Sequence, residues 1–432
     1  MSLPTWARWA VEGSPSDYTL GVEEEIMMLE PEGWSLAHEI DRVLPALEPE
    51  LGSHVTAETH KSALELRSRV HRTVAGVAAE LEDLRGALEA QLQTLGLRAA
   101  ASGTHPFAVW QEVRVSTGPR YQRVYDSMRE LARREPTFAL HVHVGVVDAD
   151  AAIRLLNSMR GHLPLLLALS ANSPLWQGRD TGLASARTPL FQAFPRVGIP
   201  RAFHNYRDWV EAVDVLLRCE AFEESTFLWW DVRPQPRFGT VEVRILDAQS
   251  TVAETVGLTA LVQCIARLEL EEGYLPAEVL DRPELLEENR FIATRDGMDA
   301  RMLDPVREAL VPARLQLDQL LEACLPHAQE LGCVDELLSV RALAEGTGAA
   351  RQLELSRGDD GLPGLVAALA ALFTSDAPAG PEGEPAPGVG LHAAAGCSAT
   401  RGRAPARAPA PPRRERSLRA LRGARRAPGT PT

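Results

Sequence analysis

Two glutamates near the N-terminus are the first residues whose type and spacing suggest chemistry. They are Glu23 and Glu25, in the segment LGVEEEI (20–26). On a strand these two side chains share one face and Glu24 lies on the other, because side chains alternate. Two adjacent carboxylates repel each other unless a cation lies between them, and Mg²⁺ or Mn²⁺ suits such an oxygen-rich site. The pair predicts a metal site, with a solvated acidic edge strand as the alternative.

A second acidic pair, Glu58 and Glu65, lies in the segment ETHKSALELRS (58–68). Seven residues apart on one regular strand, the two side chains point to opposite faces. Both reach the same site only if the chain bends or bulges between them. Metal binding by this pair is therefore a conditional prediction, and two ordinary surface carboxylates are the alternative.

A pair of histidines, His141 and His143, alternates with apolar residues in the segment LHVHVG (140–145). The alternation places both imidazoles on one strand face and the apolar side chains on the other. Zinc is disfavoured, because no third histidine or cysteine lies nearby in the sequence. The functional interpretation is phosphate contact or metal ligation beside carboxylates. Two hydrogen-bonded structural histidines are the alternative.

Glu242 and Arg244 share a strand face with Thr240 in the segment FGTVEVRI (238–245). Such a pair can divide its work, the glutamate holding a metal and the arginine a phosphate or carboxylate. A simple cross-strand ion pair is the alternative. The sequence contains neither a GxxxxGK[ST] nor a GxGxxG pattern, so phosphates have to be held by metal ions and basic side chains.

Short strands and longer helices must position these residues. Alternation predicts four strands, and apolar residues at three- and four-residue spacing predict helices between them. The predicted strands are 18–29, 62–70, 137–147 and 240–247, and the predicted helices are 74–95, 153–171, 251–270, 305–331 and 334–345. Parallel strands buried on both sides would be continuously apolar, whereas these carry polar residues on one face. We therefore expect an α+β fold, with a mostly antiparallel sheet, a polar active-site face and helices on the other face.

Composition limits the partners of the chain. Its 432 residues carry a formal charge of −14, which argues against nucleic acid and anionic membranes as partners. The five cysteines are an odd number without a C-x-x-C pair, which indicates a reducing compartment. The N-terminus lacks the continuous apolar segment of a secretion signal, and the longest apolar run is too short to span a bilayer. We therefore expect a cytoplasmic protein.

The composition changes near residue 375. From Pro378 onward the chain is dominated by Pro, Ala, Gly and Arg, and after Glu384 its only acidic residue is Glu415. Such a segment cannot bury enough apolar surface to offset the entropy of ordering it. We therefore predict a catalytic domain over residues 1–375 and a disordered basic tail over residues 376–432, with an RNA- or membrane-binding arm as the alternative for the tail.

Six segments resemble, in order, the signature blocks of the glutamate–cysteine ligase type 2, or carboxylate–amine ligase, family. They are GVEEE (21–25), ASGTHPF (101–107), HVHVG (141–145), LSANSPLWQGRDTGL (169–183), LWWDVRPQPRFGTVEVR (228–244) and NRFIATRDGMDA (289–300). The resemblance covers most of the chain. It implies a glutamine-synthetase-like fold, in which an antiparallel sheet forms a funnel for ATP and metal ions. Two features depart from the family, namely the residues 67–69 after Glu65 and the basic tail.

The resemblance also implies roles for individual residues. Five of them look like metal-binding carboxylates of the family: Glu23, Glu25, Glu65, Glu242 and, as a further candidate, Glu58. His141 resembles the nucleotide- or metal-side histidine of its strand, with His143 as the alternative. Arg244 and Arg233 are candidate catalytic residues for phosphate or substrate carboxylate, and Arg244 is also a candidate for nucleotide contact.

The activity that the resemblance implies is ATP-dependent joining of a carboxylate to an amine, with Mg²⁺ or alternatively Mn²⁺. By analogy, the γ-carboxylate of glutamate attacks the γ-phosphate of ATP, and cysteine or another amine displaces phosphate from the resulting acyl phosphate. Two other functions fit the same residues: an ATP-dependent phosphotransferase of the guanidino kinase type, and a non-catalytic nucleotide- or metal-binding relative. The sequence does not identify the amine, and the resemblance is compatible with a homodimer.

Overall fold

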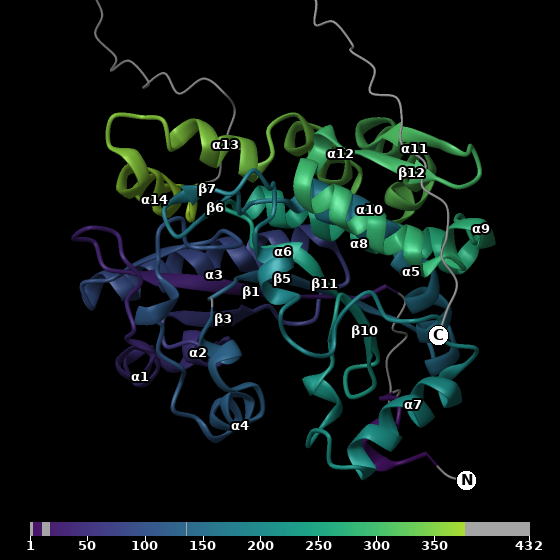
Figure 1. Cartoon of the computed structure of the whole chain (residues 1–432), viewed down its shortest axis with the longest axis horizontal. Coiled ribbons are helices and arrows are strands. Elements are labelled where there is room, and N and C mark those ends of the chain that lie inside the picture. The colour runs from purple at the N-terminus through teal and green to yellow at the C-terminus, as the bar shows by residue number, and fades with distance from the viewer. Residues whose placement is uncertain (1–2, 11–17, 135, 376–432) are drawn as a thin grey trace, which may run out of the picture. The chain divides into compact units, whose positions relative to one another are not determined.

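The computed structural model describes residues 3–10, 18–134 and 136–375 (Figure 1). The predicted disordered tail, residues 376–432, lies outside the described residues. All of the described residues belong to one unit of the chain, Met1–Glu382. Within them, no helix is long and apolar enough to cross a membrane.

A seven-stranded sheet organises this unit, in the order β10-β11-β5-β1-β3-β2, with β4 also paired to β1. Its strands are β1 (Leu20–Leu29), β2 (Val55–Ala57), β3 (Ala63–Arg67), β4 (Arg98–Ala100), β5 (Ala139–Gly145), β10 (Val232–Gln235) and β11 (Thr240–Asp247). Every pairing within it is antiparallel. β1 pairs with β5 through residues 20–24 and with β3 through residues 23–27. The predicted α+β fold with a mainly antiparallel sheet is therefore confirmed.

Three long helices cover the apolar face of the sheet. They are α3 (Val74–Thr94), α5 (Ala149–Ser170) and α8 (Val252–Glu271). Alternate strand residues such as Val22, Val142 and Val243 are fully buried against them, as period-two patterning requires. The helix α8 begins at a capping box, in which Thr251 and Glu254 satisfy each other's backbone N–H groups. The predicted helices in these three regions are confirmed to within a few residues.

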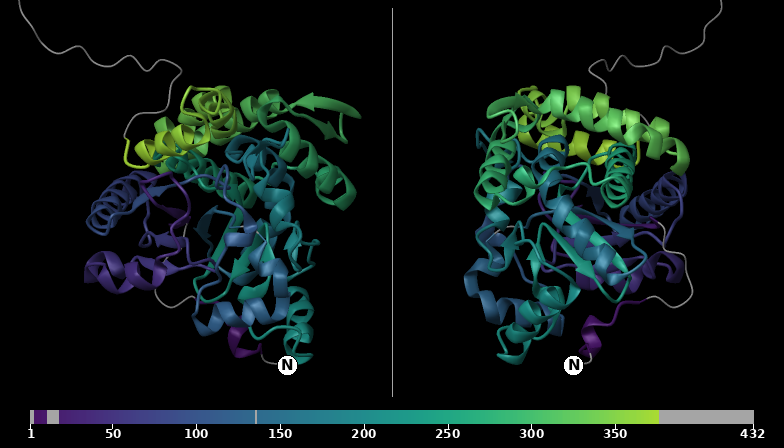
Figure 2. Two further views of the ribbon diagram at one scale, coloured as in Figure 1. Left: turned by 60° about the vertical axis from the view of Figure 1, so that its left-hand side comes forward. Right: turned by 90° about the vertical axis from the view of Figure 1, so that its right-hand side faces the viewer.

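Further helices extend the helical layer. Helix α10 (Pro283–Asp296) packs on α5, and α11 (Ala313–Leu331) and α12 (Val334–Glu345) pack on α8. Figures 1 and 2 show these green helices on the same side of the sheet in all three views. The shorter elements are α1 (Ile40–Val43), α2 (Pro49–Gly52), α4 (Pro119–Met128), α6 (Arg187–Phe191), α7 (Tyr206–Arg218), α9 (Ala277–Leu280), α13 (Gly348–Leu355), α14 (Gly361–Leu372), β6 (Leu175–Trp176), β7 (Arg179–Asp180), β8 (Val197–Gly198) and β9 (Trp229–Trp230).

The helix predicted over residues 305–331 begins later than expected, at Ala313. Residues 301–312 instead form a hairpin of β12 (Arg301–Asp304) and β13 (Ala309–Pro312), with Pro305 in its turn. Pro312 then lies at the N-cap of α11, where the missing N–H of proline costs no helical hydrogen bond. The prediction was wrong for residues 305–312, because the apolar residues of the hairpin extended the apparent helical spacing.

Glu24 lies on the apolar face of β1 and forms a buried ion pair with Arg85 of α3. Nε and Nη2 of Arg85 donate to the two carboxylate oxygens at 2.9 and 2.5 Å. The remaining Arg85 hydrogens reach the carbonyl oxygens of Gln249, Ser250 and Phe373. Both charged side chains are at most 1% exposed. This contact ties the sheet to α3, to the segment before α8 and to the end of the described chain.

Candidate active site

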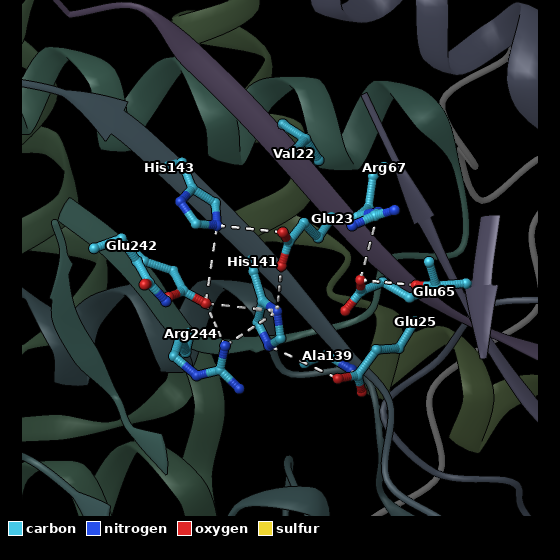
Figure 3. Close-up of polar contacts among 12 residues, drawn as sticks. Val22, Glu23, Glu25, Glu65, Arg67, Ala139, His141, His143, Glu242 and Arg244 are labelled. Atoms are coloured by element: carbon cyan, nitrogen blue, oxygen red, sulfur yellow. Dashed lines mark hydrogen bonds and ion pairs between the residues drawn. The ribbon is translucent and has the colours of Figure 1, made fainter. Parts of the chain in front are cut away.

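The register of neighbouring strands brings the predicted residues onto the face of the sheet opposite the helices. The pairs that meet across strands are Glu23 with His141, Glu25 with Glu65, and Glu242 with His143. Figure 3 shows these side chains pointing into a common space in front of the sheet. The strand alternation read from the sequence therefore places them correctly relative to one another.

Glu23, His141 and Glu242 form a cluster that is able to hold a metal ion, since one ligand atom of each lies within 4.8 Å of the others. Nδ1 of His141 lies 3.4 Å from Glu23 Oε2 and 3.9 Å from Glu242 Oε1. Nε2 of His143 lies 3.6 Å from Glu23 Oε1. The buried Nε2 atoms of both histidines have no hydrogen-bond partner among the described residues. Unpaired buried polar atoms of this kind require an explanation, and a bound ion is one.

A second group of carboxylates, Glu25, Glu58 and Glu65, adjoins this cluster. Burial, together with the charge of Glu58, raises the pKa of Glu25 to about 8. Burial and the charges of Glu23, Glu58 and Glu25 raise the pKa of Glu65 well above its usual value. A divalent cation relieves such repulsion, and carboxylate oxygens with one imidazole are a donor set that Mg²⁺ or Mn²⁺ accepts. The residues present therefore fit the metal that the sequence predicted.

Glu58 reaches this group because the chain turns back on itself. It follows directly after β2, and β3 returns antiparallel with Glu65 opposite Thr56. The hydroxyl of Thr56 donates to Oε1 of Glu65 at 3.2 Å. The bend on which the Glu58 prediction depended is therefore present between the two glutamates.

Arg233 is occupied by Glu242 and is not free to bind a substrate. Its Nε donates to Oε2 of Glu242 at 2.6 Å and its Nη2 to Oε1 at 3.2 Å. Its Nη1 donates to the carbonyl oxygens of Thr226 and Leu228. Although burial raises the pKa of Glu242, the charges of Arg233 and Arg244 outweigh it and bring that pKa well below its usual value. In this geometry Arg233 orients Glu242 and keeps it ionised.

Arg244 lies at a β-bulge. The register between β11 and β5 shifts here, so that Arg244 and Ile245 together lie opposite His141. Nη1 of Arg244 contacts the carboxylate of Glu242 and lies 3.4 Å from Nδ1 of His141. Its buried Nε has no hydrogen-bond partner in the described part of the chain. Bulges next to active sites re-aim side chains, and this one leaves Arg244 with a donor for a ligand.

The two histidines have opposite pKa shifts. Burial, assisted by the charge of Arg244, lowers the pKa of His141 to about 4. Burial also lowers the pKa of His143, but the charges of Glu242 and Glu23 outweigh it and the net shift is upward. At neutral pH His141 is therefore a neutral imidazole with a lone pair available to a metal, whereas His143 holds a proton more readily.

A pocket adjoins the carboxylates. Five charged side chains line it: Glu25, Glu58, Arg120, Arg187 and Arg244. Apolar side chains also line it: Val124, Met128, Phe191, Phe194 and Trp229. The pocket also touches His141, so a molecule bound there lies directly beside the metal-binding cluster.

Arg187, the first residue of α6, lines this pocket and was not predicted. Its Nη1 and Nη2 donate to the carbonyl oxygens of Ile245 and Arg244 at the bulge. Its Nε, although buried, has no hydrogen-bond partner within the described residues. A guanidinium in this state is suited to bind a carboxylate or a phosphate. The only signal in the sequence was its position shortly after the LSANSPLWQGRDTGL segment, since the path of that loop cannot be read from residue types.

Asp247 forms a buried ion pair with Arg187. Its carboxylate lies 3.7 Å from Nη1 of Arg187 and accepts hydrogen bonds from the hydroxyls of Ser173 and Ser185 and from the backbone N–H of Asn172. Because of the bulge, the side chains after it alternate in the opposite sense to those before it. Asp247 therefore lies opposite Ala139 of β5, on the active-site face. Asn172 and Ser173 of the segment 169–183 thus help to hold Asp247, and through it Arg187, in place.

The segment 289–300 supports the site in a similar way. Arg290 forms a buried ion pair with Asp231, with nitrogen–oxygen distances of 2.7 and 3.3 Å. The carbonyl of Asp231 accepts the backbone N–H of Arg244. At the end of α10, the carbonyl of Thr294 accepts the N–H groups of Ala184 and Ser185. Two segments that carry no ligand atoms of their own therefore position Arg244 and the loop before Arg187.

Comparison with known proteins agrees with this geometry. The model of glutamate–cysteine ligase family 2 matches residues 19–363. A protein of Rubrobacter xylanophilus named "Putative glutamate--cysteine ligase 2-1" is 41% identical over 341 residues, which cover 79% of this chain and 90% of that protein. A relative from Gloeobacter violaceus, named "Putative glutamate--cysteine ligase 2", is 38% identical over 82% of this chain and 96% of its own length.

Solved structures show the same fold at low sequence identity. A glutamate–cysteine ligase of Francisella tularensis in complex with AMP has a TM-score of 0.62 at 14% identity, covering 83% of this chain and 89% of that one. A bifunctional glutathione synthetase of Pasteurella multocida has a TM-score of 0.63 at 12% identity, covering 83% and 52%. Taken with the sequence matches, the sheet and its charged face define an ATP-dependent carboxylate–amine ligase. More particularly, the chain belongs to glutamate–cysteine ligase family 2.

Proposed function

We propose that the active-site face binds ATP with Mg²⁺ and joins the γ-carboxylate of glutamate to an amine, with cysteine as the first amine to test. The observation that carries this proposal is the group of carboxylates that meets His141 on one sheet face, beside a pocket with two arginines whose Nε atoms are buried. The names of the relatives support glutamate and cysteine as substrates. Five glutamates are proposed to hold the metal: Glu23, Glu25, Glu58, Glu65 and Glu242.

The reaction proceeds in two displacements. The donor carboxylate attacks the γ-phosphorus of ATP, the bond to the bridging oxygen breaks, and ADP leaves. The amine then attacks the acyl carbon of the acyl phosphate, loses a proton, and inorganic phosphate leaves. Bound Mg²⁺ would neutralise charge on the triphosphate during the first displacement.

The residues of this chain orient the reactants. Arg244 donates from the bulge to the phosphoryl group in transfer, where charge develops. Arg187 binds a carboxylate of the donor in the pocket, because its Nε has no other partner in the described structure. Arg233 holds Glu242 in one orientation. His141 remains neutral and completes the ligand set of the cluster.

A screen of amines for ADP release with glutamate, ATP and Mg²⁺ tests the proposal, with the amide detected by mass spectrometry. Cysteine and other amino acids form the first panel, and omission of the amine is the control. ADP and amide appearing in equal amounts is the expected result. A phosphorylated product without an amide would instead identify a phosphotransferase. Nucleotide binding without ADP release from any carboxylate and amine would identify a non-catalytic relative.

A further inference from the structure

Phe238 is an exposed aromatic residue beside the metal-binding cluster. Its side chain lies in the turn between β10 and β11 and is 56% exposed. Its ring meets the imidazole of His143 edge to face, with centroids 6.0 Å apart. Nε2 of that imidazole lies 3.6 Å from Glu23. One imidazole ring therefore separates an exposed aromatic face from the cluster.

The turn that carries Phe238 is held in place. The N–H groups of Phe238 and Gly239 both donate to the carbonyl of Gln235 at 3.0 Å, and the N–H of Ala10 donates to the carbonyl of Pro236 at 2.8 Å. Gly239 has φ of +67°, and a Cβ there would lie 2.7 Å from the carbonyl oxygen of Ala10. Only glycine fits this position. The backbone that carries the aromatic ring is therefore held in place.

The strands arrange the site in a sequence of three zones. Phe238 and His143 lie at one end, followed along the strands by the cluster of Glu23, His141 and Glu242. The pocket that contains Glu25, Arg187 and Arg244 lies at the other end. The three zones follow one another in the direction of β1, because Glu25 follows Glu23 on the same face of that strand. The pocket and the aromatic ring are thus on opposite sides of the metal-binding cluster.

We propose that Phe238 is the stacking platform for the adenine of ATP. This inference rests on the proposed ATP-dependent function. In ATP, a ribose and two further phosphates separate the base from the γ-phosphate, so the base lies beyond the cluster when the γ-phosphate faces the pocket. Every base has a π-face that stacks on an aromatic ring. The guanidinium of Arg237 lies over the Phe238 ring, 5.7 Å from its centre, so its positive charge is beside the proposed adenine site.

Calorimetric titration with ATP and with inorganic tripolyphosphate, both with Mg²⁺, tests the platform. Phe238→Ala should weaken ATP binding roughly tenfold, within the range for loss of one stacked base. It should leave tripolyphosphate binding unchanged, because that ligand has no base. Phe238→Trp should retain ATP affinity. The matched control is Phe291→Ala, which removes a 51% exposed phenylalanine that also has an arginine 5.7 Å from its ring, on α10.

Two results would overturn the platform. One is unchanged ATP affinity in Phe238→Ala. The other is an equal loss for ATP and tripolyphosphate, which would show that the ring acts on the phosphate site through His143. In either case the wild-type protein still binds both ligands and the ligase proposal stands. If the wild-type protein binds neither ligand, the proposed function itself fails.

Discussion

Glu23 and Glu25, two residues apart on β1, have pKa values on opposite sides of the usual carboxyl range. Burial raises both, but for Glu23 the charges and hydrogen bonds of His143 and His141 outweigh burial and lower its pKa below that range. Glu25 faces Glu58 instead, and its pKa is raised to about 8. At neutral pH, Glu23 is therefore ionised before any cation binds. Glu25 becomes fully ionised at that pH only when a cation binds beside it.

Single replacements of the three consecutive glutamates should affect either kcat or the free energy of unfolding, depending on the strand face of the residue. Glu23→Gln and Glu25→Gln should lower kcat by roughly a hundredfold or more, because lost metal contacts remove a few kcal/mol of transition-state stabilisation. Glu24→Gln should instead lower the free energy of unfolding by about 3 kcal/mol, because it leaves the charge of Arg85 buried and unpaired. Steady-state kinetics and thermal unfolding measure the two effects.

Wild-type protein and Glu82→Gln, a surface change on α3, are the references for both measurements. The assignment of the metal face would be refuted if Glu24→Gln abolished turnover at unchanged stability while Glu23→Gln and Glu25→Gln remained active.

Metal binding should depend on pH through Glu25. Its carboxyl is protonated below about pH 8 in the folded metal-free protein and below about pH 4 in the unfolded chain. Between these values the folded state binds more protons, so this group makes the free energy of unfolding fall as pH rises. Mg²⁺ displaces the proton, and its affinity should increase up to about pH 8 and then level off.

Thermal unfolding between pH 5 and 8, with a chelator and with Mg²⁺, measures both trends. Glu25→Gln should remove most of the difference between the two pH profiles. A Mg²⁺ affinity that is independent of pH in the wild-type protein would contradict the role of Glu25.

Arg187 should control the affinity for the donor carboxylate. Arg187→Lys keeps the positive charge near Asp247 but loses the planar pair of donors and the Nε that has no partner among the described residues. We expect KM for the donor to rise roughly tenfold to a hundredfold, with little change in KM for ATP. Arg179→Lys, at an exposed position on β7, is the control. If KM for ATP rises and KM for the donor does not, Arg187 belongs to the nucleotide site.

The boundary of the catalytic domain can be tested by truncation around Phe373. Phe373 is fully buried, its ring lies 4.8 Å from the Arg85 guanidinium, and its carbonyl accepts from Arg85. A chain that ends at Ser375 should keep the melting temperature and turnover of the full chain, as the composition of residues 376–432 predicts. A chain that ends at Leu372 should be several degrees less stable. Equal melting temperatures of the two truncated chains would show that Phe373 is not an anchor.

The sequence was sufficient for the main arrangement of the site. Strand alternation alone separates Glu23 and Glu25 from Glu24, and places His141 and His143 together. That rule holds wherever a strand is regular, and it correctly assigned the face of each of these residues.

The remaining features depend on irregular backbone and on distant segments. The bulge at Arg244 reverses the alternation, so a regular pattern puts Asp247 on the wrong face. Arg187 reaches the pocket through a loop whose path is set by contacts with Asp247 and with the end of α10. Such tertiary contacts leave no local periodicity, and the same reason explains the misassigned residues 305–312.

The pairing of β1 with β5 also has a consequence for biosynthesis. Glu23 and His141 are 118 residues apart in the chain, and closing so long a segment costs entropy before any contact between them is gained. The hairpins β2–β3 and β10–β11, by contrast, close over short turns. Since a domain emerges from the ribosome N-terminus first, a nascent chain that stops before residue 240 contains Glu23 and His141 but lacks Glu242. Such a chain cannot present the complete metal-binding cluster.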